Sequence, residues 1–266
     1  MKSSFIALLL LALLLIQPAT VLSCEWVRGT GEVFADNFTP AEARTMALRQ
    51  ARYQAIEKAT GVYVSGATLV KDFTYVGEFV KSISKGYIRE EKIISWEQDK
   101  YQPSERDFPV PILRVTLEVC VQPARPLHDT GFMITAAINK QTFTKDEKAV
   151  LEITSSRKAF LHIFNLTADD KILYYHKPPA LQMPIPVEAG VKITFPRKGI
   201  SLEMAPPAGY KKATEAFIIV ATANDINLPL VFRDKRELSL AEFYDGIMAI
   251  EGDMAESMVV YSIEGR

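Results

Sequence analysis

The sequence predicts an α+β N-terminal domain followed by an all-β immunoglobulin-like sandwich with a short C-terminal helix and strand. Three observations support this fold class: alanines recur every fourth residue from Ala43 to Ala59, apolar residues alternate along Ile112–Val121, and short apolar segments separated by turn residues recur after residue 130. The chain has 266 residues, of which 48% are hydrophobic and 24% are charged. This composition is typical of a globular protein with one or two domains.

The first domain is organised around a helix predicted at Thr39–Gly61. Thr39 is a typical N-cap, Pro40 suits the first helical position, and Glu42 completes a capping box. The alanine row forms one side of the helix with almost no bulk, so a sheet can approach it closely. We expect the charged residues of the helix to face water or the edges of the sheet: Arg44, Arg49, Arg52, Glu57 and Lys58.

Three strands are predicted to form the sheet beneath this helix, at Cys24–Phe34, Tyr87–Gln98 and Ile112–Val121. The third has the clearest pattern, because its apolar residues alternate with polar ones, as expected for a sheet with one buried face. Gly29 and Gly31 in the first strand permit a bulge or a close crossing by a helix.

A second helix is predicted at Lys71–Ser84, which gives an antiparallel sheet with two helices on one face. The polar, proline-containing segment Tyr101–Pro111 is expected to be a hairpin loop and a candidate for partner binding. The first domain is predicted to span residues 24–122. A linker at residues 123–129, marked by two prolines, separates it from the second domain at residues 130–266.

The second domain is predicted to be an antiparallel β-sandwich, because seven short strands are separated by Asp, Pro and Gly turns. A helix at Ser239–Ile250 and a last strand at Met258–Ile263 follow them. The strands are expected at Phe132–Ile138, Ala149–Thr154, Ala159–Asn165, Lys171–Tyr175, Val191–Phe195, Ile200–Glu203 and Ala216–Ala223.

Residues 1–23 are predicted to be a secretory signal peptide. Lys2 supplies the positive start, Phe5–Ile16 is a continuous apolar run, and Gln17 and Pro18 end that run. The run is too short for a comfortable membrane span, which needs ~20 residues. We therefore expect an exported protein.

The chain has two cysteines, Cys24 and Cys120, and two interpretations of Cys24 stay open. In the first, Cys24 pairs with Cys120 as a disulfide in an oxidising compartment. In the second, Val-Leu-Ser-Cys is a lipobox, and Cys24 carries the lipid of an outer-membrane lipoprotein. The spacer between the apolar run and Cys24 favours the disulfide.

No pattern typical of catalysis or cofactor binding is found in the sequence. The three histidines, His128, His162 and His176, are not at metal-ligand spacing. No serine-nucleophile motif or phosphate-binding glycine loop is present. The formal net charge of −1 gives no support to nucleic-acid binding. We expect a protein that is not an enzyme, without cofactor or metal, that contacts a membrane only if it is lipidated.

Two features of the second domain are candidates for partner binding. Tyr174 and Tyr175 form an aromatic cluster, although such clusters are more often part of a sandwich core. Leu181 and Met183 lie between prolines in the segment Pro178–Pro186, where an exposed apolar loop could dock a partner. A loop folded back onto the sheet is the alternative.

The first domain resembles the N-terminal domain of the flagellar assembly protein T family, which is shared with envelope lipoproteins of the LPP-twenty type. The resemblance covers about residues 25–121, with the strand "WVRGTGEV", the alanine helix and the segment "SISKGYI". The matching residues are Ala43, Arg44, Ala47, Ala51, Ala55, Gly61, Ser82, Gly86, Tyr87 and Ile88.

Residues 130–228 resemble a bacterial domain of unknown function, number four-three-eight-four. The segments "KAFLHIFNLTADDKILYYHKP" and "PPAGYKKATEAFIIVATAND" carry this resemblance. Together the two resemblances imply an exported, periplasmic accessory protein of the bacterial cell envelope, with other envelope proteins as partners and a non-catalytic interaction or scaffolding role. The alternatives are a periplasmic ligand-binding protein or small hydrolase that uses the sandwich surface, and a lipoprotein anchored through Cys24.

Overall fold

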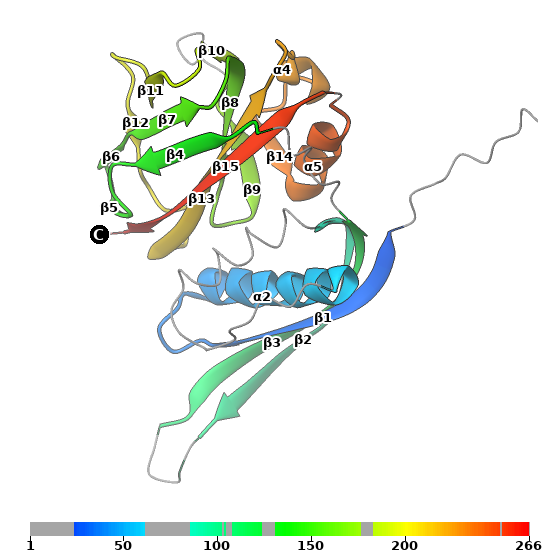
Figure 1. The fold of residues 1–266 in the computed structure, drawn as a ribbon. Helices are drawn as coiled ribbons and strands as arrows, with labels where there is room; N and C mark the ends of the chain where they lie inside the picture. Colours follow the sequence, from blue (N-terminus) through cyan, green and yellow to red (C-terminus); the bar gives the residue numbers. More distant parts are fainter. Residues whose placement is uncertain are drawn as a thin grey trace, which may run out of the picture.

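The computed structural model describes residues 24–61, 86–102, 104, 108–123, 131–176, 183–250 and 252–265. The fold is mostly β, with 50% strand and 17% helix, and its sheets are largely antiparallel (Figure 1). The predicted signal peptide, the predicted second helix at Lys71–Ser84 and residues 124–129 of the predicted linker lie outside the described residues.

The first sheet consists of β1 (Glu25–Phe34), β2 (Gly86–Tyr101) and β3 (Val110–Pro123) in the order β1-β3-β2. Both strand pairs are antiparallel. Helix α2 (Pro40–Thr60) lies along one face of this sheet, and the β2–β3 hairpin projects beyond the helix (Figure 1). The three strands and the helix confirm the elements predicted for this part of the chain.

The alanine row of α2 forms the contact with the sheet. Ala47, Ala51 and Ala55 are fully buried, because the sheet approaches the helix backbone closely. Gly29 and Gly31 make this approach possible: a Cβ atom built on Gly31 would lie 1.9 Å from the carbonyl oxygen of Ala47. The helix begins with the predicted capping box between Thr39 and Glu42.

A disulfide joins Cys24 to Cys120, with 5.3 Å between the two Cα atoms, and confirms the first interpretation of Cys24. It ties the start of β1 to β3 on the sheet face opposite α2. Since the bridged residues are 96 positions apart in the sequence, the closed loop is long, and long loops lose the most chain entropy when cross-linked. A disulfide of this kind indicates an oxidising compartment outside the cytoplasm.

The described residues of the second part of the chain fold into one large sheet, two smaller sheets and two short helices. The larger sheet has the order β14-β9-β8-β13-β15-β5, with β10 beside β8, and the smaller sheets have the orders β11-β7-β4 and β12-β6. The strands are β4 (Ile134–Ile138), β5 (Thr142–Thr144), β6 (Lys148–Ala149), β7 (Leu151–Ser155), β8 (Ala159–Leu166), β9 (Lys171–Tyr174), β10 (Ile185–Val187), β11 (Lys192–Phe195), β12 (Leu202–Glu203), β13 (Lys212–Thr222), β14 (Glu237–Ser239) and β15 (Met254–Glu264).

These sheets form a sandwich-like layer pair, as predicted, with two differences. The pairing of β15 with β5 is parallel, whereas the prediction was antiparallel throughout. In addition, α4 (Leu228–Val231) and α5 (Leu240–Met248) cover part of the outer face of the large sheet, where Phe243 packs against Phe164. The large sheet is therefore buried on both faces, which explains why nearly all of β8 and β13 is buried.

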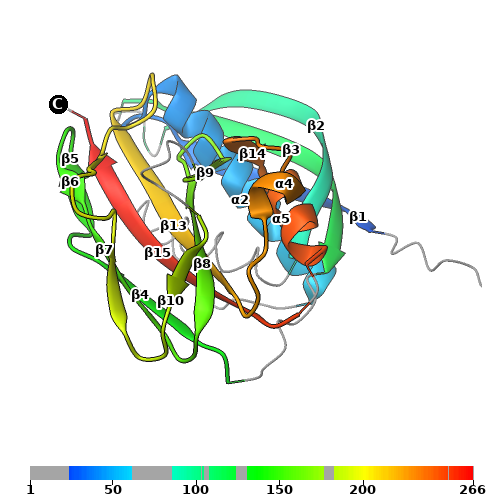
Figure 2. The ribbon, with the colours of Figure 1, turned by 90° about the horizontal axis from the view of Figure 1, so that it is seen from above.

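Helix α2 lies between the first sheet and the sandwich-like part (Figures 1 and 2). Its side opposite the alanine row faces the sandwich-like part, so two of its arginines are not solvated. Arg49 is only 4% exposed, and the Arg52 side chain is mostly buried. The expectation that these two arginines face water or sheet edges is wrong, because the second part of the chain covers them.

Candidate functional site

A network of charged residues connects α2 to the β8–β9 turn of the sandwich-like part. Arg49 forms an ion pair with Asp170 and donates hydrogen bonds to the backbone carbonyls of Thr167 and Thr214, at 2.8 and 3.2 Å. Three acceptors from the second part of the chain thus converge on one guanidinium. Asp170 adopts a left-handed backbone conformation (φ 62°), which aspartate tolerates better than most residues.

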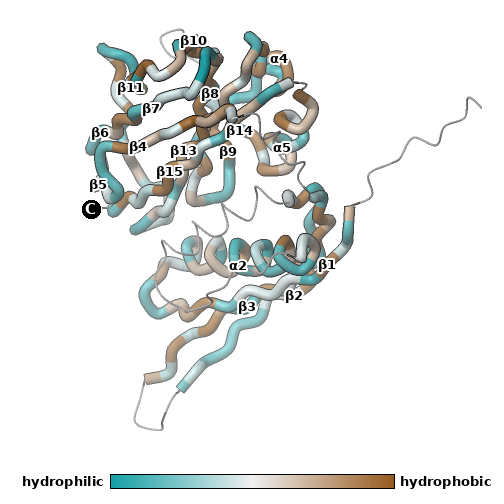
Figure 3. Tube along the Cα trace, in the orientation of Figure 1, coloured by the Kyte–Doolittle hydropathy of each residue, from teal (hydrophilic) through white to brown (hydrophobic). Residues whose placement is uncertain are grey.

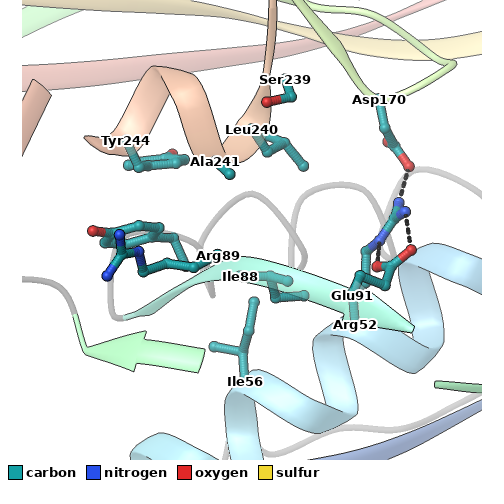
Figure 4. Close-up of a pocket in the computed structure, with 11 residues that line it drawn as sticks. Arg52, Ile56, Ile88, Arg89, Glu91, Asp170, Ser239, Leu240, Ala241 and Tyr244 are labelled. Carbon is teal, nitrogen blue, oxygen red and sulfur yellow. Dashed lines mark hydrogen bonds and ion pairs between the residues drawn. The ribbon is translucent and has the colours of Figure 1, made fainter. Parts of the chain in front are cut away.

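Arg52 extends this network to the first sheet. It forms an ion pair with Asp170 and a bidentate pair with Glu91 of β2, at 2.6 and 2.9 Å (Figure 4). Burial alone would lower the pKa of Arg52, but the hydrogen bonds and charges of Glu91 and Asp170 raise it above its ordinary value. Arg52 is therefore a permanently charged link between helix, sheet and sandwich.

A pocket of about 280 Å³ opens next to this network, between α2, β2 and α5 (Figure 4). One side is apolar, with Ile56, Ile88 and Leu240, and the other side carries Arg52 and Glu91. At this polar side, the carboxylates of Glu91 and Asp170 form ion pairs with the guanidinium of Arg52. The geometry suits a structural junction better than acid–base chemistry, which needs a carboxylate free to exchange a proton.

Two tyrosines close the opposite end of the pocket. Tyr87 of β2 stacks on Tyr244 of α5, with 5.6 Å between ring centroids, and the Tyr87 hydroxyl donates a hydrogen bond to Asp245 at 2.9 Å. Arg89 lies 3.6 Å from the same carboxylate. These contacts anchor the start of β2 to the C-terminal helix, so both ends of the pocket are held by residues from both parts of the chain.

Glu256 of β15 is a half-buried residue that lies outside the ion-pair network. Its Oε1 atom is buried and accepts no hydrogen bond from the residues that the structure describes, and the buried Tyr244 hydroxyl also makes none with them. Burial raises the pKa of Glu256 from 4.5 to about 7. The carboxyl is therefore protonated in mildly acidic solution and ionises near neutral pH.

Replacing Glu256 by glutamine is expected to remove a pH-dependent loss of stability. A carboxyl with a raised pKa holds its proton more tightly in the folded chain than in the unfolded chain. Its contribution to the free energy of unfolding is therefore complete below pH 4.5 and is lost as the pH rises through about 7. Between pH 5 and pH 8 the wild type should lose about 2.5 kcal/mol of unfolding free energy relative to Glu256→Gln, measured by urea unfolding at these two pH values.

Glu264→Gln is the matched control for this measurement, because Glu264 is an exposed carboxylate near the end of the same strand. It should keep the pH slope of the wild type. Equal slopes in wild type and Glu256→Gln would show that the carboxyl is solvated.

The residues of the sandwich that were predicted to bind a partner do not form an exposed surface. Tyr174 and Met183 are buried, and Tyr175 is half-buried against Phe195 and Phe217. Leu181 lies outside the described residues. Of the two interpretations of these tyrosines, the structure therefore favours a place in the sandwich core, because the large sheet is covered on both faces.

His162 is fully buried beside Tyr174, with 2.8 Å between its Nδ1 atom and the tyrosine hydroxyl. Burial lowers its pKa to about 3, so the imidazole is neutral. Among the described residues, no carboxylate contributes to this shift. A buried neutral histidine bonded to a tyrosine does not meet the requirement for a general base that reaches a substrate.

The projecting β2–β3 hairpin carries the largest group of exposed apolar side chains among the described residues. Phe108 at its tip is 93% exposed. The hydrophobic colour of β3 continues along this hairpin beyond the helix (Figure 3). The other exposed apolar residues on β2 and the facing part of β1 are Trp26, Ile93, Ile94, Trp96 and Tyr101.

Basic side chains contact two of these aromatic rings. Lys92 lies 4.4 Å from the centroid of Trp26, and the Arg44 guanidinium lies 5.8 Å from the centroid of Trp96. The sequence pointed to this region only through the loop Tyr101–Pro111. It missed Ile93 and Trp96, because an apolar residue in a strand is normally assigned to a core.

No protein-family model matches the chain, and no curated protein matches it. The resemblances of residues 25–121 and 130–228 to bacterial envelope families therefore stay predictions. Within the described part of the chain, no group of three or more His, Cys, Asp or Glu side chains could hold a metal ion, and no helix is long and apolar enough to cross a membrane.

Proposed function

We propose that this protein is a non-catalytic interaction module of the bacterial cell envelope, exported to the periplasm, and that the β2–β3 hairpin is its docking surface. The exposed apolar side chains of the hairpin carry this proposal. Exposed apolar patches on an otherwise charged surface are typical of protein–protein interfaces. Aromatic residues and arginine are also the residue types enriched in such interfaces.

The architecture supports this role, because the hairpin is attached to a rigid base. The disulfide fixes β3 to β1, the alanine row fixes the sheet to α2, and Arg49 and Arg52 fix α2 to the sandwich-like part. A binding surface on a rigid base loses less conformational entropy when a partner binds.

The disulfide argues against the lipoprotein alternative. A lipid anchor on Cys24 is attached through the same sulfur atom that bonds to Cys120. Mass spectrometry of the mature protein decides between them, since a diacylglyceryl group on Cys24 would exclude the disulfide. A hydrolase that uses the sandwich surface would need a pocket with a histidine such as His162 or His176 beside a carboxylate. The shielded, neutral His162 gives this alternative no support.

Site-specific photo-crosslinking in cells tests the docking surface. A photoreactive amino acid at Ile94 or Phe108 should give discrete adducts with protein. The same group at Met133, an exposed apolar residue on the sandwich-like part, should give none or only weak ones. Equal labelling from all three positions, or none from the hairpin, would contradict the proposed surface.

A further inference from the structure

Among the described residues, strand β2 is an edge strand of the first sheet, because the strand order is β1-β3-β2. Figures 1 and 2 show it at the outside of the molecule along most of its length. Residues 92–97 are all exposed except the half-buried Ser95. An edge strand presents unpaired backbone N–H and C=O groups and is a ready template for another strand.

A bulge gives this part of the edge an unusual distribution of side chains. The pairing with β3 shifts by one residue between Ile93 and Ser95, so Ile94 is an extra residue. Ile93 and Trp96 therefore lie on the same sheet face, opposite Leu117 and Val115, although they are three positions apart. The flanking charged residues lie on the other face: Lys92 opposite Glu118, and Glu97 opposite Arg114.

This pattern is complementary to itself. We infer that two copies of this chain associate through antiparallel pairing of their β2 edges, with the two-fold axis between Ile94 and Ser95. In this register Lys92 of each copy faces Glu97 of the other, and Ile93 faces Trp96. Opposite charges and aromatic–aliphatic pairs are the cross-strand neighbours that stabilise antiparallel sheets. A two-fold contact of this kind closes after two copies.

The same register also limits the contact. Beyond the six central residues, Glu90 would face Asp99 at both ends, and like charges directly opposite are unfavourable. The paired segment is therefore short, and interfaces of this size are weak. We expect association in the micromolar range or weaker. The inference rests on the proposed function, since it names a second copy as the occupant of the hairpin surface.

Charge reversal tests the register. In Lys92→Glu alone, each new glutamate would face Glu97 of the other copy, and in Glu97→Lys alone each new lysine would face Lys92. Either variant should raise the dissociation constant at least about tenfold. The double variant Lys92→Glu/Glu97→Lys should restore it. An equimolar mixture of the two single variants should form mixed dimers, because every cross-strand pair is again of opposite charge.

The experiment is sedimentation equilibrium of the oxidised, exported chain from about 1 µM to about 1 mM, the range of weak interfaces. The exchanged residues are exposed, but each reversal places a like charge opposite Glu118 or Arg114 of β3. Urea unfolding of every variant therefore accompanies the sedimentation measurement, and only variants that are folded at the working temperature are compared. A reversible dimer that both single variants weaken and the mixture restores supports the inference. A monomeric wild type, or single variants that associate like the wild type, would overturn it.

The two proposals can fail separately. If the wild type is monomeric while Ile94 still gives a discrete photo-adduct with a different envelope protein, the dimer is wrong and the docking surface stands. If the wild type is monomeric and the hairpin gives no adduct, both are wrong.

Discussion

Replacing Gly31 by alanine is expected to destabilise the protein by more than about 4 kcal/mol, or to prevent folding. The new Cβ atom would lie 1.9 Å from the backbone oxygen of Ala47, and the same distance separates a Cβ on Gly29 from the backbone oxygen of Ala51. Rotamer changes cannot relieve a clash with backbone. Helix and strand must therefore move apart and leave a gap along the alanine row.

Urea unfolding at neutral pH measures this effect, and Arg28→Ala is the matched control. Arg28 lies between Trp26 and Thr30 on the same strand, and its side chain is mostly exposed. The control should stay within about 0.5 kcal/mol of the wild type. If Gly31→Ala unfolds at the same urea concentration as Arg28→Ala, helix α2 does not lie as close to β1 as the structure shows. A strongly reduced yield of exported Gly31→Ala protein would agree with the expected loss of folding.

The close helix–sheet contact could be predicted because its determinants are local in the sequence. The alanine spacing from Ala43 to Ala59 identifies one side of a helix, and Thr39 with Gly61 identifies its ends. The alternation in β3 identifies the buried face of its strand. Cys24 and Cys120 allowed a disulfide that the structure confirms, although the sequence alone kept lipidation open.

The contacts between helix α2 and the sandwich-like part could not be predicted, because they depend on residues far apart in the sequence. Arg49 and Asp170 are separated by 121 positions. Arginines opposite an apolar face are usually solvated, so periodicity assigns them to the surface. The exposed Ile93 and Trp96 were missed for the converse reason: strand patterns assign apolar residues to a core, and only the position of β2 at the edge exposes them.

A second large effect is expected at this junction, where Arg49→Leu should destabilise the protein by about 3 kcal/mol. Arg49 is 4% exposed and satisfies Asp170 and two backbone carbonyls. Leucine fills similar space but leaves those buried acceptors without a donor, and the cost of such groups exceeds the net value of the bonds themselves. Urea unfolding followed by tyrosine and tryptophan fluorescence measures the change.

Two further variants separate the ion pair from simple packing. Arg44→Leu removes an exposed arginine from the same helix and should change stability by less than about 0.5 kcal/mol. Asp170→Asn keeps a residue that tolerates the left-handed backbone at this position while it removes the charge.

Because Arg49 and Asp170 contact each other, the two substitutions together should cost less than the sum of the single effects. Strict additivity would mean that the pair contributes nothing to the junction. Since Arg52 also contacts Asp170, a triple variant with Arg52→Leu should then unfold the sandwich-like part and the first sheet in separate steps. One cooperative transition in that variant would show that the remaining contacts are sufficient to couple them: the stacking of Tyr87 on Tyr244, and the hydrogen bonds from the Lys211 and Lys212 backbone N–H groups to Glu42.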